Sequence, residues 1–474
     1  MEPIGLVERL GRWSSGRGPL YVLLAARLRA LIDEGELPPG ARLPPDRALA
    51  SALAVGRTTV VTAYELLAVE GRIVRRQGSG TRVAGAEAAS VRATTDAPSF
   101  LHLLEPRDGV ILLACAAPDA PPPELAEAYI RTLPELARTD GDIGYHPMGH
   151  PTLRRAIADR YEQRGVPTAP DQILVTNGGQ QALSLLARAL VRPGDRVLVE
   201  APTYPGALET FREEAAVPRT LPVGLPGLAA AVAEHSPAFA YVIPTFQNPT
   251  GAVMPALPRR RLVETAVTAG VVLIEDEVPA ELGFPGEETP PPLAAYHDQV
   301  ITIGSLSKVV WGGLRIGWVR APVPVIARLA RRRAVHDLGG NVPAQLAAAD
   351  LLPRLDILRQ RGAVWRQARH DHLRAELARH LPDWHAPAVR GGQTLWIRLP
   401  HGDGTSFAQT ALRHGVAVLP GVGLDADGHS EQYVRIQFLV SQEQLSEAAH
   451  RLAAAWKDYR APKGRVTSPP AMAV

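Results

Sequence analysis

The spacing of hydrophobic positions changes along the chain. Apolar side chains recur at helical spacing over residues 20–34, and shorter stretches with the same character follow at 46–53 and 57–70. Two short strand-like segments then flank the basic, glycine-containing stretch 75–81. The first part of the chain is therefore predicted to form three helices followed by a β-hairpin.

A different pattern begins after a compositional break. Residues 86–107 are rich in Ala, Ser, Thr and Pro and have no sustained period, which is typical of a linker. From about 108 to 460, short continuous apolar runs alternate with helical patterns. Such runs suit strands of a mostly parallel sheet that is covered by helices on both faces. Four of these runs lie at 196–199, 240–243, 271–274 and 300–303.

These patterns predict a multidomain α/β protein. We expect a winged helix-turn-helix at 15–85, a linker at 86–107, a larger α/β domain at 108–460 and a disordered tail at 461–474. The larger domain is expected to consist of a large part, about 150–340, and a smaller C-terminal α/β part, about 345–460.

Composition narrows the class of protein. Among 474 residues no apolar stretch is long enough to span a bilayer, and the N-terminus lacks the order of a secretory signal, so we expect a cytoplasmic protein without membrane contact. The single cysteine, Cys115, excludes an intrachain disulfide and is interpreted as a small buried apolar residue. Residues 1–90 contain 12 Arg against 9 Asp and Glu, which equals the net charge of +3 of the whole chain and permits contact with phosphate groups.

Lysine is almost absent. Of 51 Lys and Arg residues only three are lysine, and Lys308 is the only one in the first 456 residues. A guanidinium stays protonated, whereas a primary amine can lose its proton in a dry site and condense with an aldehyde. Lys308 is therefore interpreted as a covalent cofactor anchor, the alternative being a stray surface lysine.

Each predicted strand delivers a polar group at its C-terminal end, where open parallel sheets place their ligands. These groups are an aromatic ring, an amide, a carboxylate and the amine, the set that a pyridine aldehyde phosphate requires. They belong to Tyr204, Asn248, Asp276 and Lys308. Glu275-Asp276-Glu277 could instead be only an acidic, solvent-exposed strand end.

This order of motifs resembles the fold-type I aminotransferases that use pyridoxal 5'-phosphate, and the first domain resembles the GntR-type winged helix. Together they resemble the MocR/GabR class of bacterial transcription regulators over roughly residues 15–458. The resemblance implies an internal aldimine at Lys308, Asp276 paired with the ring nitrogen, Tyr204 stacked on the ring and Asn248 donating to the phenolic oxygen.

The resemblance also implies a phosphate cradle and a substrate contact. Arg315 and the hydroxyl of Ser305 would hold the phosphate, helped by the loop that opens a helix at Gly178, Gly179 and Gln180. Arg435 would bind a substrate carboxylate, unless it is an ordinary strand arginine. Tyr145 matches a loop that reaches the phosphate of a neighbouring subunit, and we expect a homodimer.

Some positions depart from the aminotransferase pattern close to the predicted chemistry. The usual tyrosine shortly after Asp276 is missing, and Val278 and Pro279 stand there. Gly179 replaces a Ser or Thr of the cradle, and Gly312 replaces a proline. The loss of one hydrogen bond to a charged group costs about 1.5 to 3 kcal/mol, which favours retained cofactor binding over efficient catalysis.

The first domain supplies candidates for contact with a double-stranded DNA operator. The segment 43–60 resembles the GntR pattern, with Gly56 in place of the usual serine cap. By this resemblance Arg57, Thr58 and Thr59 lie at the start of the recognition helix. The remaining contacts to backbone or minor groove would come from Arg47, Arg75, Arg76 and Gly78.

Other basic and histidine-rich signals are interpreted as structural. His370, His372 and His380 are not expected to bind metal, because residues two apart point to different helix faces, and no metal site is predicted. The triplets 259–261 and 331–333 are interpreted as solvated helix faces.

The sequence leaves three functions open. The first is a transcription regulator that senses an amine, an amino acid or pyridoxal phosphate through the aldimine at Lys308, without being primarily an enzyme. The second is a working aminotransferase with a DNA-binding appendage. The third is a plain DNA-binding repressor whose large domain only dimerises.

Overall fold

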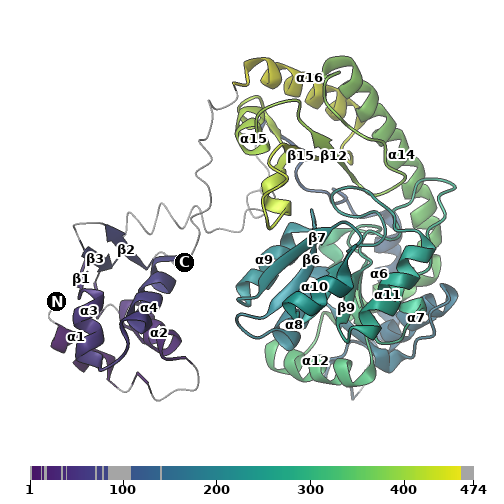
Figure 1. Ribbon diagram of the computed structural model, residues 1–474. Helices are drawn as coiled ribbons and strands as arrows, with labels where there is room; N and C mark the ends of the chain where they lie inside the picture. Colours follow the sequence, from purple (N-terminus) through teal and green to yellow (C-terminus); the bar gives the residue numbers. More distant parts are fainter. Residues whose placement is uncertain are drawn as a thin grey trace. The chain divides into compact units, whose positions relative to one another are not determined.

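The computed structural model describes residues 3–11, 13–14, 19–33, 36–38, 40–69, 72–76, 80–83, 108–138 and 141–460. It divides into two compact units, Met1–Leu101 and His102–Val474, and each is described by itself (Figure 1). The predicted linker, the predicted tail and Gly78 lie outside the described residues. In the described part of the chain, no helix is both long and apolar enough to cross a bilayer.

The N-terminal unit is a small helical bundle with a three-stranded sheet. Its sheet has the order β1-β3-β2 and both pairs are antiparallel. The buried side chains of all the helices form one core, in which Tyr64 also donates a hydrogen bond to the carbonyl of Pro44 at 3.0 Å. The elements are α1 (Pro3–Leu10), α2 (Leu20–Asp33), β1 (Arg42–Leu43), α3 (Asp46–Leu53), α4 (Arg57–Val69), β2 (Ile73–Arg76) and β3 (Gly80–Val83).

Helix α1 was not anticipated from the sequence. Its buried Leu6 and Leu10 join the core of the unit, although it precedes the expected start of the domain at residue 15. The helix is only 8 residues long, which is too short for a clear hydrophobic period. Helices α2, α3 and α4 and the hairpin lie where the pattern places them.

A mostly parallel sheet of seven strands organises the second unit. Its order is β5-β11-β10-β9-β8-β6-β7. Only β11 runs against its neighbours, so the other strands all point the same way. The strands are β5 (Ile173–Thr176), β6 (Arg196–Ala201), β7 (Val217–Pro222), β8 (Phe239–Val242), β9 (Val272–Asp276), β10 (Ile301–Ser305) and β11 (Gly317–Arg320).

Helices cover both faces of this sheet, as the continuous apolar strands require (Figure 1). One core lies between the sheet and one set of helices: α6 (Pro123–Leu136), α7 (Pro151–Gln163), α10 (Leu228–His235), α11 (Ala256–Thr268) and α13 (Val342–Leu351). The core on the other face involves α8 (Gly179–Leu190), α9 (Pro205–Glu213) and α12 (Val323–His336).

The C-terminal part of this unit has its own core. An antiparallel sheet of order β12-β15-β14 packs with three helices, and a parallel β13-β4 pair ties residues 111–112 to it. The elements are β4 (Ile111–Leu112), α14 (Leu355–His380), β12 (Thr394–Arg398), α15 (Gly404–Arg413), β13 (Val416–Ala417), β14 (Leu419–Pro420), β15 (Tyr433–Gln437) and α16 (Gln442–Asp458).

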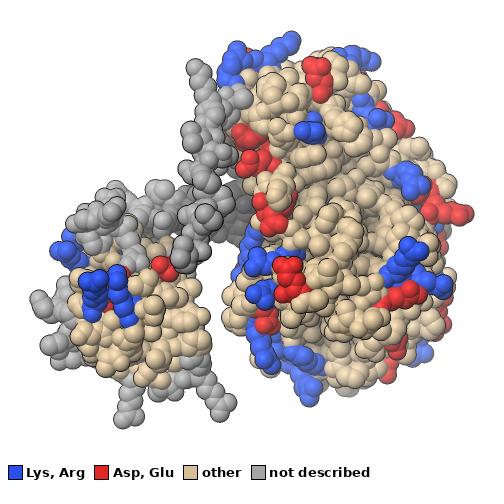
Figure 2. Space-filling view, viewed as in Figure 1, with Lys and Arg blue, Asp and Glu red and all other residues tan. Residues whose placement is uncertain are grey.

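The two arginine triplets are not simply solvated faces. Arg259 and Arg333 are fully buried, whereas their triplet neighbours are exposed. Consecutive residues point about 100° apart around a helix, so three in a row cannot share one exposed face. Exposed basic residues of α12 form part of the blue patch at the lower edge of the second unit in Figure 2.

Candidate cofactor site at the strand ends

Four neighbouring parallel strands place the expected cofactor residues at one edge of the sheet. Strands β6, β8, β9 and β10 are adjacent and parallel, so their carboxyl ends share that edge. Asp276 is the last residue of β9, whereas the other three residues follow the ends of β6, β8 and β10 within a few positions. Those three are Tyr204, Asn248 and Lys308.

The acidic stretch at the carboxyl end of β9 is buried rather than solvent-exposed. Glu275, Asp276 and Glu277 are 0%, 4% and 6% exposed. Their side chains have separate partners, because successive residues of a strand point to opposite faces. Glu275 accepts from the backbone N–H of Leu293 at 2.8 Å, and Glu277 forms an ion pair with Arg164 at 2.6 Å.

Asp276 is held by two hydrogen bonds. The hydroxyl of Tyr241 donates to its Oδ2 at 2.5 Å, and the backbone N–H of Val278 donates to its Oδ1 at 2.9 Å. Burial nevertheless raises the pKa of Asp276, although these bonds and the charge of Lys308 oppose the shift. The nearby groups thus do not fully stabilise the negative charge of Asp276, and a cationic ring nitrogen would stabilise it further.

Lys308 has the properties of an amine that can become a nucleophile. Its Nζ donates to the carbonyl of Ala116. Burial lowers the pKa of Lys308, and Arg435 lowers it further, whereas Cys115 and Asp276 act in the opposite direction. A larger fraction of the amine is therefore neutral than for an ordinary lysine.

Arg435 and Asn248 form one hydrogen-bonded pair. Nη1 of Arg435 donates to Asn248 Oδ1 at 3.0 Å, and its Nη2 donates to the carbonyl of Ala114 at 2.5 Å. Burial lowers the pKa of Arg435 to about 10. Its Nε is buried and has no hydrogen-bond partner among the described residues. Arg435 is therefore not an ordinary exposed strand arginine, and no carboxylate among the described residues pairs with it.

The residues expected to hold a phosphate include Arg315 and Gly178, which lie in contact with one another. Arg315 donates from Nη2 to the carbonyl of Asn177 and from Nη1 to that of Gly312 at 3.2 Å. A Cβ atom on Gly178 would lie 2.8 Å from Arg315 Nη2, and Gly178 has a φ of +83°. The backbone conformation at position 178 thus favours glycine, and a Cβ atom there would displace the Arg315 guanidinium. Ser305 contacts the hydroxyl of Ser307 at 2.8 Å.

Two departures from the aminotransferase pattern are linked in space. A Cβ atom on Gly179 would lie 3.1 Å from Cγ2 of Val278. The absence of a side chain at 179 and the presence of valine at 278 therefore belong to one packing arrangement, in which a larger residue at 179 would press on Val278.

The observed contacts alter the expectations for Gln180 and Cys115, whereas the expectation for Tyr145 stays a prediction. The Gln180 side chain bridges Tyr204 and α9, accepting from Tyr204 at 3.0 Å and donating to Thr210 at 2.8 Å, so only its backbone remains for an anion. Tyr145 is 61% exposed, and it takes no part in the core of this unit. Cys115 is half-buried, and it interacts electrostatically with Lys308 and Arg435.

The segment 114–116 is the part of the site that sequence reasoning missed. Its carbonyls accept hydrogen bonds from Arg435 and Lys308, which lie 321 and 192 residues away in the chain. It is held nearby because Leu113 and Gln437 bond through their backbones at 2.8 Å. Backbone carbonyls carry no sequence signal, and the cysteine within the segment was interpreted as a small buried apolar residue rather than as part of a site.

Three of the expected DNA-contacting residues lie at the surface of the N-terminal unit. Arg57 and Thr58, in the first turn of α4, and Arg47 on α3 are exposed, whereas Thr59 is half-buried. Arg75 and Arg76 end strand β2, and their side chains lie outside the described part of the structure.

Comparison with known proteins identifies both units. Residues 108–452 match the model of the family "Aminotransferase class I and II", and residues 20–83 match "Bacterial regulatory proteins, gntR family". The chain thus belongs to the aminotransferase class I and II family, and it is a GntR-type regulator fused to an aminotransferase-like domain. Pyridoxal 5'-phosphate is the cofactor that this membership implies.

Individual relatives show the same combination. The "Probable rhizopine catabolism regulatory protein MocR" of Rhizobium meliloti is 34% identical over 77% of this chain and 78% of its own length. The pyridoxine biosynthesis transcriptional regulator PdxR of Corynebacterium glutamicum is 31% identical over 78% of this chain and 81% of its own.

A solved structure supports the fold of the larger unit. LysN, an α-aminoadipate aminotransferase from Thermus thermophilus solved with N-(5'-phosphopyridoxyl)-L-leucine, has a TM-score of 0.68. The two sequences are 29% identical, and the alignment covers 78% of this chain and 97% of LysN.

The residues at the strand ends fit pyridoxal phosphate. A buried carboxylate short of positive charge, a buried Arg435 with an unpartnered Nε and an amine with a lowered pKa occupy one site. The Asp276 carboxylate suits the ring nitrogen of the cofactor, and the Lys308 amine suits its aldehyde. Arg435 suits the carboxylate of a ligand that binds beside the cofactor.

We predict that Gly178→Ala weakens cofactor retention at least about tenfold, because the new methyl group displaces the Arg315 guanidinium. Gly165→Ala is the matched control, since Gly165 has a similar φ of +77° but no neighbouring atom within 4 Å of the place that a Cβ would take. Dissociation of pyridoxal phosphate during dialysis measures the effect. Equal losses in the two variants would show that backbone strain alone is responsible.

The charges around Lys308 predict that two substitutions shift its pKa in opposite directions. Competitive acetylation of the apoprotein, followed by peptide mapping, should give Lys308 a reactivity midpoint below the 10.5 of an ordinary lysine, with exposed Lys457 as internal reference. Asp276→Asn should lower this midpoint, because it removes an attraction that raises the pKa. Arg435→Gln should raise it, because it removes a repulsion. A shift in the same direction for both variants would contradict the proposed electrostatics.

Proposed function

We propose that this protein is a pyridoxal phosphate-dependent, DNA-binding transcription regulator that senses an amine, an amino acid or the cofactor itself through Lys308. The observation that carries the proposal is the shared location of Lys308, Asp276 and Arg435 in a unit whose chain also contains a GntR-type domain. The relatives MocR and PdxR, which are named as regulators, support this combination.

Each residue has a distinct part in holding the cofactor. Lys308 supplies the amine for covalent attachment, and Asp276 keeps a proton at the ring nitrogen, with Tyr241 fixing the carboxylate. Tyr204 would lie against the ring, and Asn248 would orient the phenolic oxygen. The phosphate would be held by Arg315, Ser305 and the N–H groups that open helix α8. The cofactor supplies an electrophilic carbon with which a primary amine can condense.

Arg435 favours an effector that carries a carboxylate. Its guanidinium is desolvated, and its bonds go to an amide oxygen and a backbone carbonyl rather than to an acid. A ligand carboxylate would gain a charge-assisted, bidentate interaction there. The amine of an amino acid would thus react at the carbon to which Lys308 is attached, and its carboxylate would bind Arg435.

Binding of the effector would be transmitted by the release of Lys308. Its amine would no longer be tied to the cofactor, and the contacts with the carbonyls of residues 114–116 could rearrange. Those residues lie shortly after the segment that connects the two units and directly beyond β4 and Leu113, so a shift there would bias the placement of the DNA-binding units in a dimer. Arg47, Arg57, Thr58 and Thr59, together with Arg75, Arg76 and Gly78, would contact the operator, and Tyr145 would reach the second subunit.

A working aminotransferase is the second candidate. The specific observation in its favour is that the site retains both the amine and the carboxylate-binding arginine. The valine at 278 in place of a tyrosine removes one expected donor. Sustained production of a keto acid over many turnovers would favour this function.

The decisive experiment measures operator binding while a panel of amines and amino acids is titrated. We predict that the parent protein changes its operator affinity with one class of amine, and that Lys308→Ala retains basal DNA binding but loses the response. Lys457→Ala is the control because Lys457 is exposed on α16. Arg57→Ala should weaken DNA binding by about tenfold without changing effector uptake. An unchanged response in Lys308→Ala would contradict the sensing function.

A further inference from the structure

Three side chains from two helices meet at the surface of the C-terminal part, away from the cofactor site. Glu376 and His380 are four residues apart on α14 and therefore share one face of the helix. His450 comes from α16, and its ring centroid lies 4.2 Å from that of His380. One ligand atom from each residue lies within 4.8 Å of the others.

Among the described residues, each of the two imidazoles has one nitrogen atom without a hydrogen bond. His450 Nδ1 lies 3.1 Å from the carbonyl of Ser446, which can only accept, so Nδ1 carries the proton and Nε2 of a neutral ring keeps its lone pair. His380 Nε2 is buried and has no hydrogen-bond partner in the described part of the chain. Metal-binding histidines characteristically donate their second N–H to a backbone carbonyl, as His450 does.

The carboxylate of Glu376 completes the group. Its side chain is 8% exposed, and its Oε1 is bonded to Arg379 at 2.8 Å. Oε2 lies 3.6 Å from His380 Nε2, which is too long for a good hydrogen bond but compatible with two atoms bound to one ion. Glu376 can therefore contribute one oxygen without breaking its pairing with Arg379.

We propose that Glu376, His380 and His450 bind one divalent transition-metal ion of the zinc class. Two imidazoles and one carboxylate are the ligand types that Zn²⁺ accepts, at distances of about 2.0 to 2.2 Å. His450 is exposed, so solvent can occupy the fourth position. The ion would connect the end of α14 to α16 and stabilise the C-terminal part of the unit.

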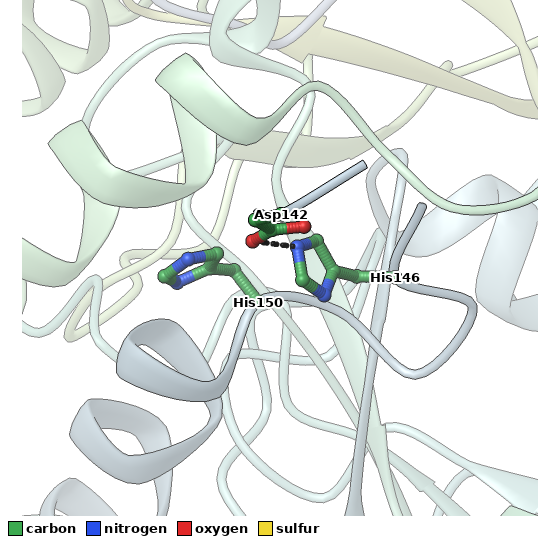
Figure 3. A group of neighbouring side chains, drawn as sticks. All are labelled: Asp142, His146 and His150. Atoms are coloured by element: carbon green, nitrogen blue, oxygen red, sulfur yellow. Dashed lines mark hydrogen bonds and ion pairs between the residues drawn. The ribbon is translucent and has the colours of Figure 1, made fainter. Parts of the chain in front are cut away.

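A second group, Asp142, His146 and His150, meets the same distance criterion but is explained without a metal (Figure 3). The Asp142 carboxylate points at His146 Nε2, 3.0 Å away. His150 Nδ1 accepts from the backbone N–H of Thr152 at 3.3 Å, at the start of helix α7. A neutral His150 in that arrangement carries its proton on Nε2, so neither nitrogen is free.

The proposed site differs from the expectation that His370, His372 and His380 do not bind metal. That expectation rests on the spacing of His370 and His372 along one helix, and the proposal involves neither of them. His370 contacts Asp371 at 2.8 Å, and His372 contacts Ser446 at 2.8 Å. The partner of His380 is instead His450, which lies 70 residues further along the chain and is brought close only by the packing of α14 on α16.

Titration of tag-free, chelator-treated full-length protein with Zn²⁺ tests the proposal, with Co²⁺ as a visible probe of the bound geometry. We expect one equivalent per chain and a rise in Tm on metal addition, because the ion binds the folded state. His380→Gln and His450→Gln should each weaken binding at least about tenfold and abolish the rise in Tm. Circular dichroism of the metal-free variants verifies that they are folded, and exposed His450 makes this variant the safer one.

His146→Gln is the matched control, since it removes a histidine from the other group and should leave the affinity and the Tm shift unchanged. The proposal is overturned if the parent takes up no metal, if His450→Gln binds as the parent does, or if binding is lost in His146→Gln instead.

Discussion

The structure around the strand ends depends on one buried carboxylate. Asp276 sits at the carboxyl end of a central strand, and burial raises its pKa in spite of two hydrogen bonds. A buried charge is tolerated only when it is paired and hydrogen-bonded. The neighbouring amine of Lys308 meets part of this need, and a protonated ring nitrogen in the site would meet it more completely.

The topology of the sheet places the other cofactor residues beside Asp276. Because β6, β8, β9 and β10 are parallel neighbours, the residues that follow them share one edge of the sheet. The same burial that raises the pKa of Asp276 lowers those of Lys308 and Arg435. A carboxylate, an amine and a guanidinium in a dry site are therefore each altered in the direction that favours a ligand carrying the complementary groups.

Much of this arrangement could be predicted from the sequence. Continuous apolar strands followed by polar residues placed Lys308 and Asp276 at one edge, and the scarcity of lysine singled out Lys308. The carbonyls of residues 114–116 and the Gly179–Val278 packing could not be predicted, because they are backbone and volume effects between distant segments. The hydrogen bond from Tyr241 to Asp276 was missed because it joins side chains of two neighbouring strands that are 35 residues apart in the sequence. Helix α1 was missed because it is short, and the Glu376, His380 and His450 group because it spans two helices.

Borohydride reduction of the cofactor-loaded protein followed by peptide mass spectrometry tests the central claim most directly. The account predicts a single pyridoxyl group on the peptide that contains Lys308, with none on the peptide of Lys457. In Asp276→Asn, the labelled fraction at equal cofactor concentration should fall. A pyridoxyl group located elsewhere, or a protein that remains unlabelled at saturating pyridoxal phosphate, would contradict the account.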